Sequence, residues 1–155
     1  MFVLAKKKSL GIYFLLVFAG ISTIWFQLNF DDLWLDEMSS FWISDPSLSF
    51  KETILRHREV DWHNPPLFNL ILKEFLNFTK YDPTNARYLG LIFGTAIIIF
   101  FGILSYEIKN DNSFLISTFL ASVSIYIINY SQEVRPYSLL LLLSIINIFL
   151  YYRII

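Results

Sequence analysis

The sequence predicts an all-α, polytopic membrane protein whose first external loop carries interfacial helices. The mean hydropathy is +0.53, and 55% of the residues are hydrophobic against 16% charged, which is far from the composition of a soluble domain. Four uncharged runs, residues 10–28, 88–106, 113–130 and 137–152, are long enough to cross a hydrocarbon core of roughly 30 Å. We therefore expect one membrane domain, residues 1–155, with four spanning helices.

Charge and cysteine content exclude several classes of partner and cofactor. The cations are scattered along the chain and form no basic stripe, so nucleic acid is not an expected partner. The sequence has no cysteine, which excludes disulfides, thiolate metal sites and a cysteine nucleophile.

The first apolar run, residues 10–28, follows three lysines at positions 6–8. It is longer than the apolar core of a cleaved signal peptide, about 7–15 residues, and it ends in large side chains, so we interpret it as an uncleaved anchor. The positive-inside rule places the lysines in the cytoplasm and Asn29 outside. A multi-pass protein of the inner cell membrane with an external loop at residues 29–86 is the expected topology.

Three short helices are predicted within the external loop. If residues 33–43 are helical, Trp34, Leu35, Met38, Phe41 and Trp42 share one face, Asp36 points from the opposite face, and Glu37 lies at the flank. Pro46 ends this helix, and the sequence from Ser49 to Glu52 is a capping box that begins another.

The third loop helix, residues 67–78, follows a double proline and carries a polar stripe of Asn69, Lys73 and Asn77. Twelve residues are too few to span a membrane in the usual way, so we expect it to be interfacial or re-entrant. In that case the external loop and the polar turn at residues 131–135 lie on the same side of the membrane. If the helix crosses, they lie on opposite sides.

The remaining runs are separated by polar turns at residues 109–112 and 131–136. The run at 88–106 contains Gly90 and Gly94, a spacing that permits close helix packing in membranes.

Five carboxylates, those of Asp31, Asp32, Asp36, Glu37 and Asp61, gather in a loop between almost uncharged segments. Chemistry is therefore expected in this loop. From the residues alone, a solvated acidic helix end is favoured over a functional carboxylate as the explanation of Asp36.

Four motifs occur in order: residues 34–42, Trp-Leu-Asp-Glu-Met-Ser-Ser-Phe-Trp; residues 61–67, Asp-Trp-His-Asn-Pro-Pro-Leu; Arg87 at the start of a membrane helix; and residues 130–137, Tyr-Ser-Gln-Glu-Val-Arg-Pro-Tyr. This ordered set resembles the N-terminal part of C-type membrane glycosyltransferases, nearest to the bacterial branch related to protein O-mannosyltransferases and lipid A aminoarabinose transferases. The resemblance implies a polyprenyl-phosphate sugar donor, a lipid, protein or glycan acceptor, and transfer on the outer face of the membrane.

The resemblance assigns the catalytic base to Asp36, with Glu37 beside it as a supporting acid. A carboxylate suits the role because an attacking hydroxyl must lose its proton as it reaches the anomeric carbon. Polyprenyl phosphate is a good leaving group, so a protein acid is not required. Glu37 is expected to orient Asp36 or the acceptor, or to cap a neighbouring helix.

Asp61 and His63 are candidates for contact with the sugar or acceptor. The same residue types ligate divalent metals, but no third ligand is evident, so we expect no metal cofactor. A hydrogen-bonded loop turn fixed by the prolines is the structural alternative. Many relatives join His directly to the two prolines, whereas Asn64 intervenes here.

Arg87 and Arg135 are candidates for holding the lipid phosphate, because a guanidinium is always charged and can bind two oxygens. The alternatives are a snorkelling interfacial arginine or an ion pair with Glu133.

A rival class is a non-catalytic, small multi-pass protein such as an assembly partner or transporter subunit. Ionisable residues inside spans often mark transport pathways, and their scarcity here disfavours a transporter. Enzymes of the resembled family match only over about their first third, so we expect the chain to be an N-terminal portion and leave its activity in isolation as a question.

Overall fold

The computed structural model describes residues 2–26, 28, 32–109 and 111–154, and all regular elements in those residues are α-helices. This confirms the predicted all-helical class. The predicted positions of Asn29 and Asp31 fall outside the described residues. The eight described helices are α1 (Phe2–Trp25), α2 (Leu35–Ile43), α3 (Phe50–Val60), α4 (Leu67–Phe78), α5 (Pro83–Ile108), α6 (Asp111–Ser122), α7 (Ile125–Gln132) and α8 (Tyr137–Ile154).

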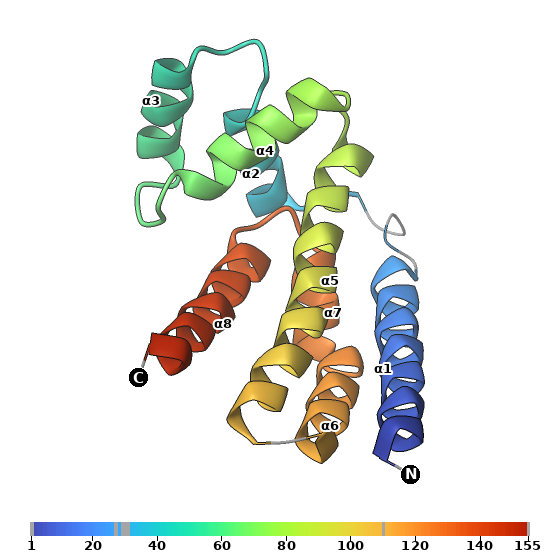
Figure 1. The fold of residues 1–155 in the computed structure, drawn as a ribbon. Coiled ribbons are helices and arrows are strands. Elements are labelled where there is room, and N and C mark those ends of the chain that lie inside the picture. Colours follow the sequence, from blue (N-terminus) through green and yellow to red (C-terminus); the bar gives the residue numbers. More distant parts are fainter. Residues whose placement is uncertain (1, 27, 29–31, 110, 155) are drawn as a thin grey trace.

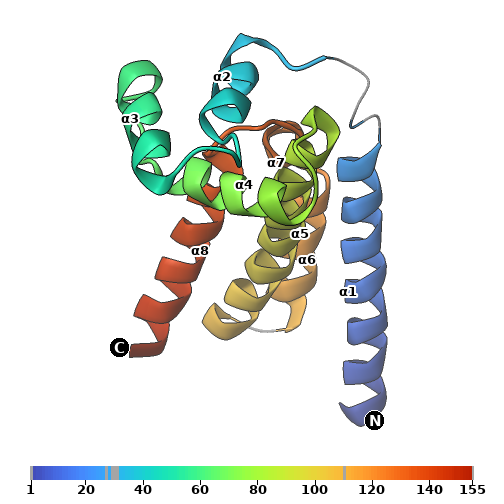
Figure 2. The ribbon, with the colours of Figure 1, turned by 90° about the horizontal axis from the view of Figure 1, so that it is seen from above.

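The helices form two parts (Figure 1). Helices α1, α5 and α8 and the bent pair α6–α7 run side by side, and α2, α3 and α4 gather at one end of them, as the second view also shows (Figure 2). The beginning of α1 and the end of α8 both lie at the opposite end. The main apolar core joins α1, α5, α6, α7 and α8, and a second core, which includes Phe68, Leu72 and Leu89, joins α4 to α5 and α8.

Two helices, α5 and α8, are long and apolar enough to cross a membrane, and the bent pair α6–α7 would make a third span. The apolar part of α1, Leu10–Trp25, is shorter than the length required for a span. The described residues therefore support two or three spanning helices, against the four predicted.

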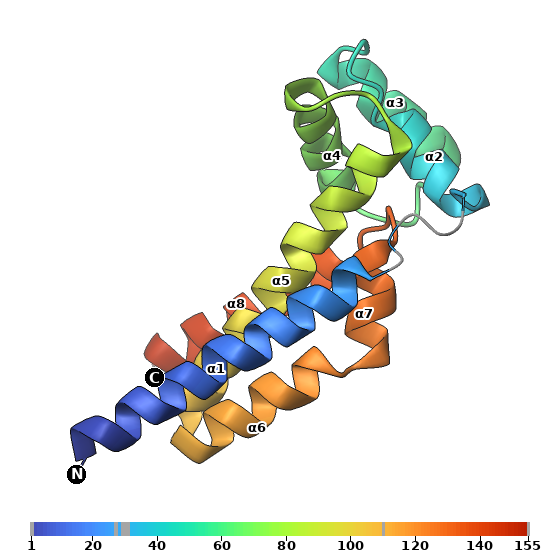
Figure 3. The same ribbon diagram turned by 90° about the vertical axis from the view of Figure 1, so that its right-hand side faces the viewer.

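The predicted single span at residues 113–130 is wrong as a straight helix, because α6 and α7 meet at 52° (Figure 3). The buried hydroxyl of Ser122 donates hydrogen bonds to the carbonyl oxygens of Thr118 and Leu16, and α7 begins after Ser124. A serine that bonds back to its own helix competes with the backbone pattern and bends it. Hydropathy alone does not reveal such a break.

The close packing predicted for Gly90 and Gly94 is confirmed at the contact of α5 with α7. A Cβ atom on Gly90 would lie 2.5 Å from the carbonyl oxygen of Ser131, and one on Gly94 would collide with the Ser131 side chain. The two glycines thus allow the end of α7 to lie directly on α5.

Helix α5 begins earlier than the predicted residue 88. The carboxylate of Asp82 accepts a hydrogen bond from the backbone N–H of Thr84 at 2.9 Å, and Pro83 occupies the first turn, a combination that favours a helix start. Arg87 therefore lies inside α5.

The loop helices form as predicted, with α4 at residues 67–78 and α2 ending before Pro46. The capping box of α3 is present: the Ser49 N–H donates to the Glu52 carboxylate at 2.7 Å, and the Glu52 N–H donates to the Ser49 hydroxyl at 3.3 Å. The polar stripe of α4 does not face outward along its length, because Asn69 and Lys73 are buried and Asn77 is exposed.

Candidate functional site

The Glu37 carboxylate is buried, with 2% of the residue exposed, and connects three parts of the chain. Its Oε1 accepts a hydrogen bond from the Val134 N–H at 2.8 Å. Its Oε2 accepts hydrogen bonds from the Trp34 N–H and from the Arg87 guanidinium, each at 3.2 Å. One carboxylate thus holds the start of α2, the second turn of α5 and the turn between α7 and α8.

Arg87 is also buried, at 8% exposed. Besides Glu37, its guanidinium donates hydrogen bonds to the carbonyl oxygens of Leu28 at 3.0 Å and Asp32 at 3.2 Å. These contacts bind the Arg87 guanidinium to other parts of the protein. The observed contacts match neither predicted alternative for Arg87, because the side chain is buried rather than snorkelling and its ion pair is with Glu37 rather than Glu133.

The Asp36 side chain points in a different direction from that of Glu37. It is the more accessible of the two acids, with 47% of its side chain exposed. Its Oδ2 lies 3.8 Å from Nη2 of Arg135, and the Arg135 Nη1 donates a hydrogen bond to the Asp36 carbonyl oxygen at 3.3 Å. The different roles expected of the two adjacent acids agree with their different burial.

Arg135 lies between two carboxylates. Its Nη1 is 3.9 Å from Oδ2 of Asp61, a distance similar to that from Asp36 and longer than a hydrogen bond. Arg135 is 8% exposed, and within the described part of the chain its Nε has no hydrogen-bond acceptor. The alternative of a pair with Glu133 is met only by a charge effect, because Arg135 acts to lower the pKa of Glu133 while its ion-pair contacts are with Asp36 and Asp61.

Asn64, which the sequence analysis treated as an extra residue, fixes Asp61. Its side-chain amide donates a hydrogen bond to Oδ1 of Asp61 at 2.7 Å. The backbone carbonyl oxygen of Asn64 lies 2.6 Å from Nε2 of the buried His57. Sequence reasoning missed both Asn64 and His57. The signal available was an asparagine three residues after an aspartate, before a proline, which is typical of a turn.

His63 does not join this group. It is exposed, and its ring lies 3.8 Å from the Trp62 ring. The structure thus brings Asp36, Glu37, Asp61, Arg87 and Arg135 to one end of the long helices and leaves His63 aside. Across residues 2–26, 28, 32–109 and 111–154, no group of three or more possible metal-ligating side chains is present.

Glu133 lies beside this group and is partly buried. Burial raises the pKa of the Glu133 carboxyl, and the negative charges of Glu37 and Asp36 raise this pKa further, while Arg135 opposes them. The charges of two α2 carboxylates therefore act on Glu133 in the turn between α7 and α8.

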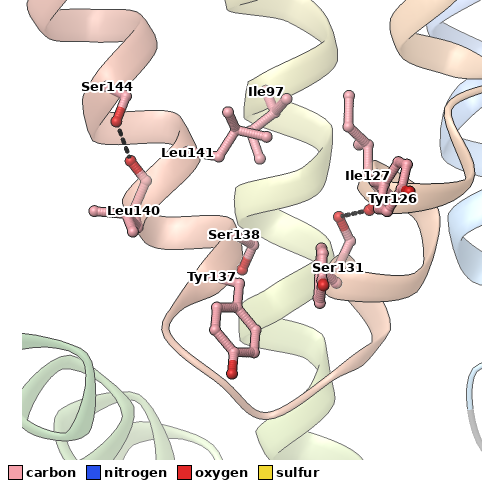
Figure 4. Close-up of a pocket in the computed structure, with 10 residues that line it drawn as sticks. Ile97, Tyr126, Ile127, Ser131, Tyr137, Ser138, Leu140, Leu141 and Ser144 are labelled. Carbon is pink, nitrogen blue, oxygen red and sulfur yellow. Dashed lines mark hydrogen bonds between the residues drawn. The ribbon is translucent and has the colours of Figure 1, made fainter. Parts of the chain in front are cut away.

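An apolar groove lies between α7 and α8 over α5 (Figure 4). The Tyr137 ring, which lines the groove, lies 5.6 Å from the Arg135 guanidinium carbon and 4.9 Å from the Tyr130 ring. Figure 4 shows Ser138, Leu141 and Ser144 of α8 along one side and Ile127 and Ser131 of α7 along the other.

Fold and site together define a helical protein with two or three apolar helices able to cross a membrane and a carboxylate–guanidinium cluster at one end of them. Comparison with protein families, curated proteins and solved structures finds no match to the chain.

Proposed function

We propose that the protein transfers a sugar from a polyprenyl-phosphate donor to an acceptor hydroxyl at the outer face of the inner membrane. The observation that carries this proposal is the 3.8 Å separation of the Asp36 carboxylate from the Arg135 guanidinium. A group able to accept a proton and a cation able to bind phosphate share one site, and the acid is half exposed.

The proposed step is a displacement at the anomeric carbon. The acceptor oxygen forms a new bond to that carbon while its proton passes to Asp36, and the bond from the carbon to the phosphate oxygen breaks. Polyprenyl phosphate leaves with the electron pair, and Arg135 stabilises its charge. Asn64 fixes Asp61, whose carboxylate lies 3.9 Å from the Arg135 guanidinium, and Glu37 holds α2 against the turn that carries Arg135.

The apolar groove supports a lipid-linked donor. Its lining residue Tyr137 lies next to Arg135, so a phosphate at the guanidinium would place an attached hydrocarbon chain beside the groove. The acceptor is a lipid, protein or glycan hydroxyl that reaches Asp36 from its exposed side.

Asp36→Asn tests the proposal in the full-length protein reconstituted in vesicles with a panel of polyprenyl-phosphate sugars. Transfer should fall by about 100-fold or more because the proton acceptor is lost, while membrane insertion is unchanged. Glu59→Gln, on the exposed side of α3, is the matched control and should transfer sugar normally. Unchanged turnover in Asp36→Asn would refute the base assignment, and absence of transfer from all donors by the unaltered protein would refute the activity.

A further inference from the structure

A polar cavity that Asp36 does not line lies next to Glu37, between the end of α1, the start of α2 and the end of α7. Its volume is about 480 Å³, within the range of small-molecule sites. Among the described residues it is lined by Leu28, Asp32, Trp34, Glu37, Arg87, Asn129, Gln132 and Glu133. Neither the apolar groove nor the contact between Asp36 and Arg135 shares this space.

The charges of the cavity disfavour a small anion. Three carboxylates line it against one guanidinium, and the Arg87 guanidinium is already bound by Glu37 and two carbonyl oxygens, so a phosphate would meet net negative charge. The lining acids of the described chain do not form a metal-ligating group.

The hydrogen-bonding groups suit a neutral ligand rich in hydroxyls. The Gln132 amide nitrogen donates to the carbonyl oxygens of Ile24 at 2.8 Å and Phe26 at 2.9 Å, which leaves its Oε1 as an acceptor. Glu133 and Asp32 supply carboxyl oxygens, and the Asn129 amide supplies donors and an acceptor.

Trp34 adds a flat apolar surface to this set. Half of the residue is exposed, and it lines the same cavity as Glu133. An indole ring offers a large apolar area with a fixed shape, which matches the C–H face of a pyranose ring, while the hydroxyls on the ring edge meet the polar groups.

We propose that this cavity is a pyranose-binding subsite in which Glu133 hydrogen-bonds a sugar hydroxyl and Trp34 stacks on the ring. The subsite rests on the proposed glycosyl transfer and assigns a sugar of the reaction to the cavity lined by Glu37, the residue that follows Asp36. Glu133 is thereby a specificity-determining residue, because it contacts hydroxyls that differ in configuration between sugars.

The test is saturation-transfer difference NMR of the protein in lipid nanodiscs, with methyl glucopyranosides and mannopyranosides of both anomeric forms as probes. Nanodiscs are used because glycoside detergents would compete for the cavity. The protein should bind at least one glycoside, and Glu133→Ala and Trp34→Leu should each weaken binding by about tenfold or more, as expected for loss of a charged hydrogen bond or of a stacking ring.

Matched controls are Glu59→Ala on α3 and Trp42→Leu on α2, neither of which lines the cavity, and both should bind as the unaltered protein does. Circular dichroism confirms that each variant keeps its helices. Lack of binding to every glycoside, or binding that survives both cavity variants, overturns the subsite. No donor lipid is present in this measurement, so its result is independent of the transfer assay. Failure of the transfer assay would overturn the proposed reaction. Whether the cavity binds a sugar would still be decided by the NMR measurement.

Discussion

The carboxylate of Glu37 lies 3.2 Å from the guanidinium of Arg87, and the two side chains are 2% and 9% exposed. They belong to α2 and α5, fifty residues apart in the sequence. Glu37 also accepts the Val134 N–H, so this buried pair determines where the turn that carries Arg135 lies relative to Asp36.

Removing one member of this pair should destabilise the protein strongly. In Glu37→Gln or Arg87→Met, a charge stays buried without its counter-charge, which costs about 3–5 kcal/mol of unfolding free energy. Denaturant-induced unfolding in mixed micelles measures the loss. The double variant should lose less than the sum of the single variants, because it leaves no uncompensated charge.

Glu107→Gln is the matched control, since Glu107 and Arg153 form an ion pair at 2.6 Å with 29% and 58% of their side chains exposed. An exposed pair of this kind contributes about 0–1 kcal/mol. Equal effects of Glu37→Gln and Glu107→Gln would contradict the importance assigned to the buried pair.

Asn64→Ala should lower sugar transfer without unfolding the protein. The variant removes the 2.7 Å hydrogen bond that holds Asp61 beside Arg135, and a loosened positioning contact reduces the rate by about tenfold. Steady-state kinetics with the active donor measures the change. Asn77→Ala, at an exposed position of α4, is the control and should have normal kinetics. A normal rate in Asn64→Ala would show that Asp61 needs no hydrogen bond from Asn64.

Gly90→Ala should disturb the turn that bears Glu133 and Arg135. The new Cβ would lie 2.5 Å from the Ser131 carbonyl oxygen and 3.2 Å from that of Glu133, and such overpacking costs about 1–3 kcal/mol. Thermal unfolding in nanodiscs checks this. Gly11→Ala, where nothing lies within 4 Å, should be neutral or stabilising because alanine favours a helix. Stability gained in both variants would argue against close contact of α5 with α7.

The pKa of Glu133 predicts how its replacement changes stability with pH. Burial, together with Glu37 and Asp36, raises the pKa in the folded protein above its ordinary value of about 4.3. The protonated form is thus favoured on folding, so the contribution to stability is present below pH 4 and is lost as pH rises through the folded pKa. Glu133→Gln should therefore be more stable than the unaltered protein at pH 7, and the difference should vanish near pH 4.

Glu52→Gln gives the opposite sign. Hydrogen bonds from Ser49 lower the pKa of Glu52, so this acid stabilises the protein above its ordinary pKa and loses the effect as pH falls. Unfolding midpoints measured at pH 7 and at pH values below the ordinary glutamate pKa of about 4.3 distinguish the two variants. A Glu133→Gln effect that does not change with pH would contradict the raised pKa.

Cysteine labelling tests the topology with little interference, because the natural chain has no cysteine. Single cysteines at positions 36 and 132 should react with an impermeant reagent from the same outer side, since Glu37 contacts Val134 and Asp36 contacts Arg135. Labelling from opposite sides would mean that residues 67–78 cross the membrane.

Much of the fold follows from local signals. The bounds of α4, the start of α8 at Tyr137 and the capping box at Ser49 agree with the structure, because hydrophobic runs, prolines and caps act within a few residues. The bend between α6 and α7 escaped prediction. It lies beside Ser122, whose hydroxyl contacts the Leu16 carbonyl of another helix, far away in the sequence.

Some features of the candidate site likewise follow from the local sequence, and others follow only from the tertiary structure. The sequence by itself determined that carboxylates gather between apolar helices and that Asp36 and Glu37, about 100° apart on a helix, point in different directions. Only the tertiary structure decided that Glu37 is the buried acid, that Arg87 is bound by the protein and that Asn64 supports Asp61. Ion pairs and hydrogen bonds act over a few ångströms, and packing brings their partners together from positions 50 to about 100 residues apart in the chain.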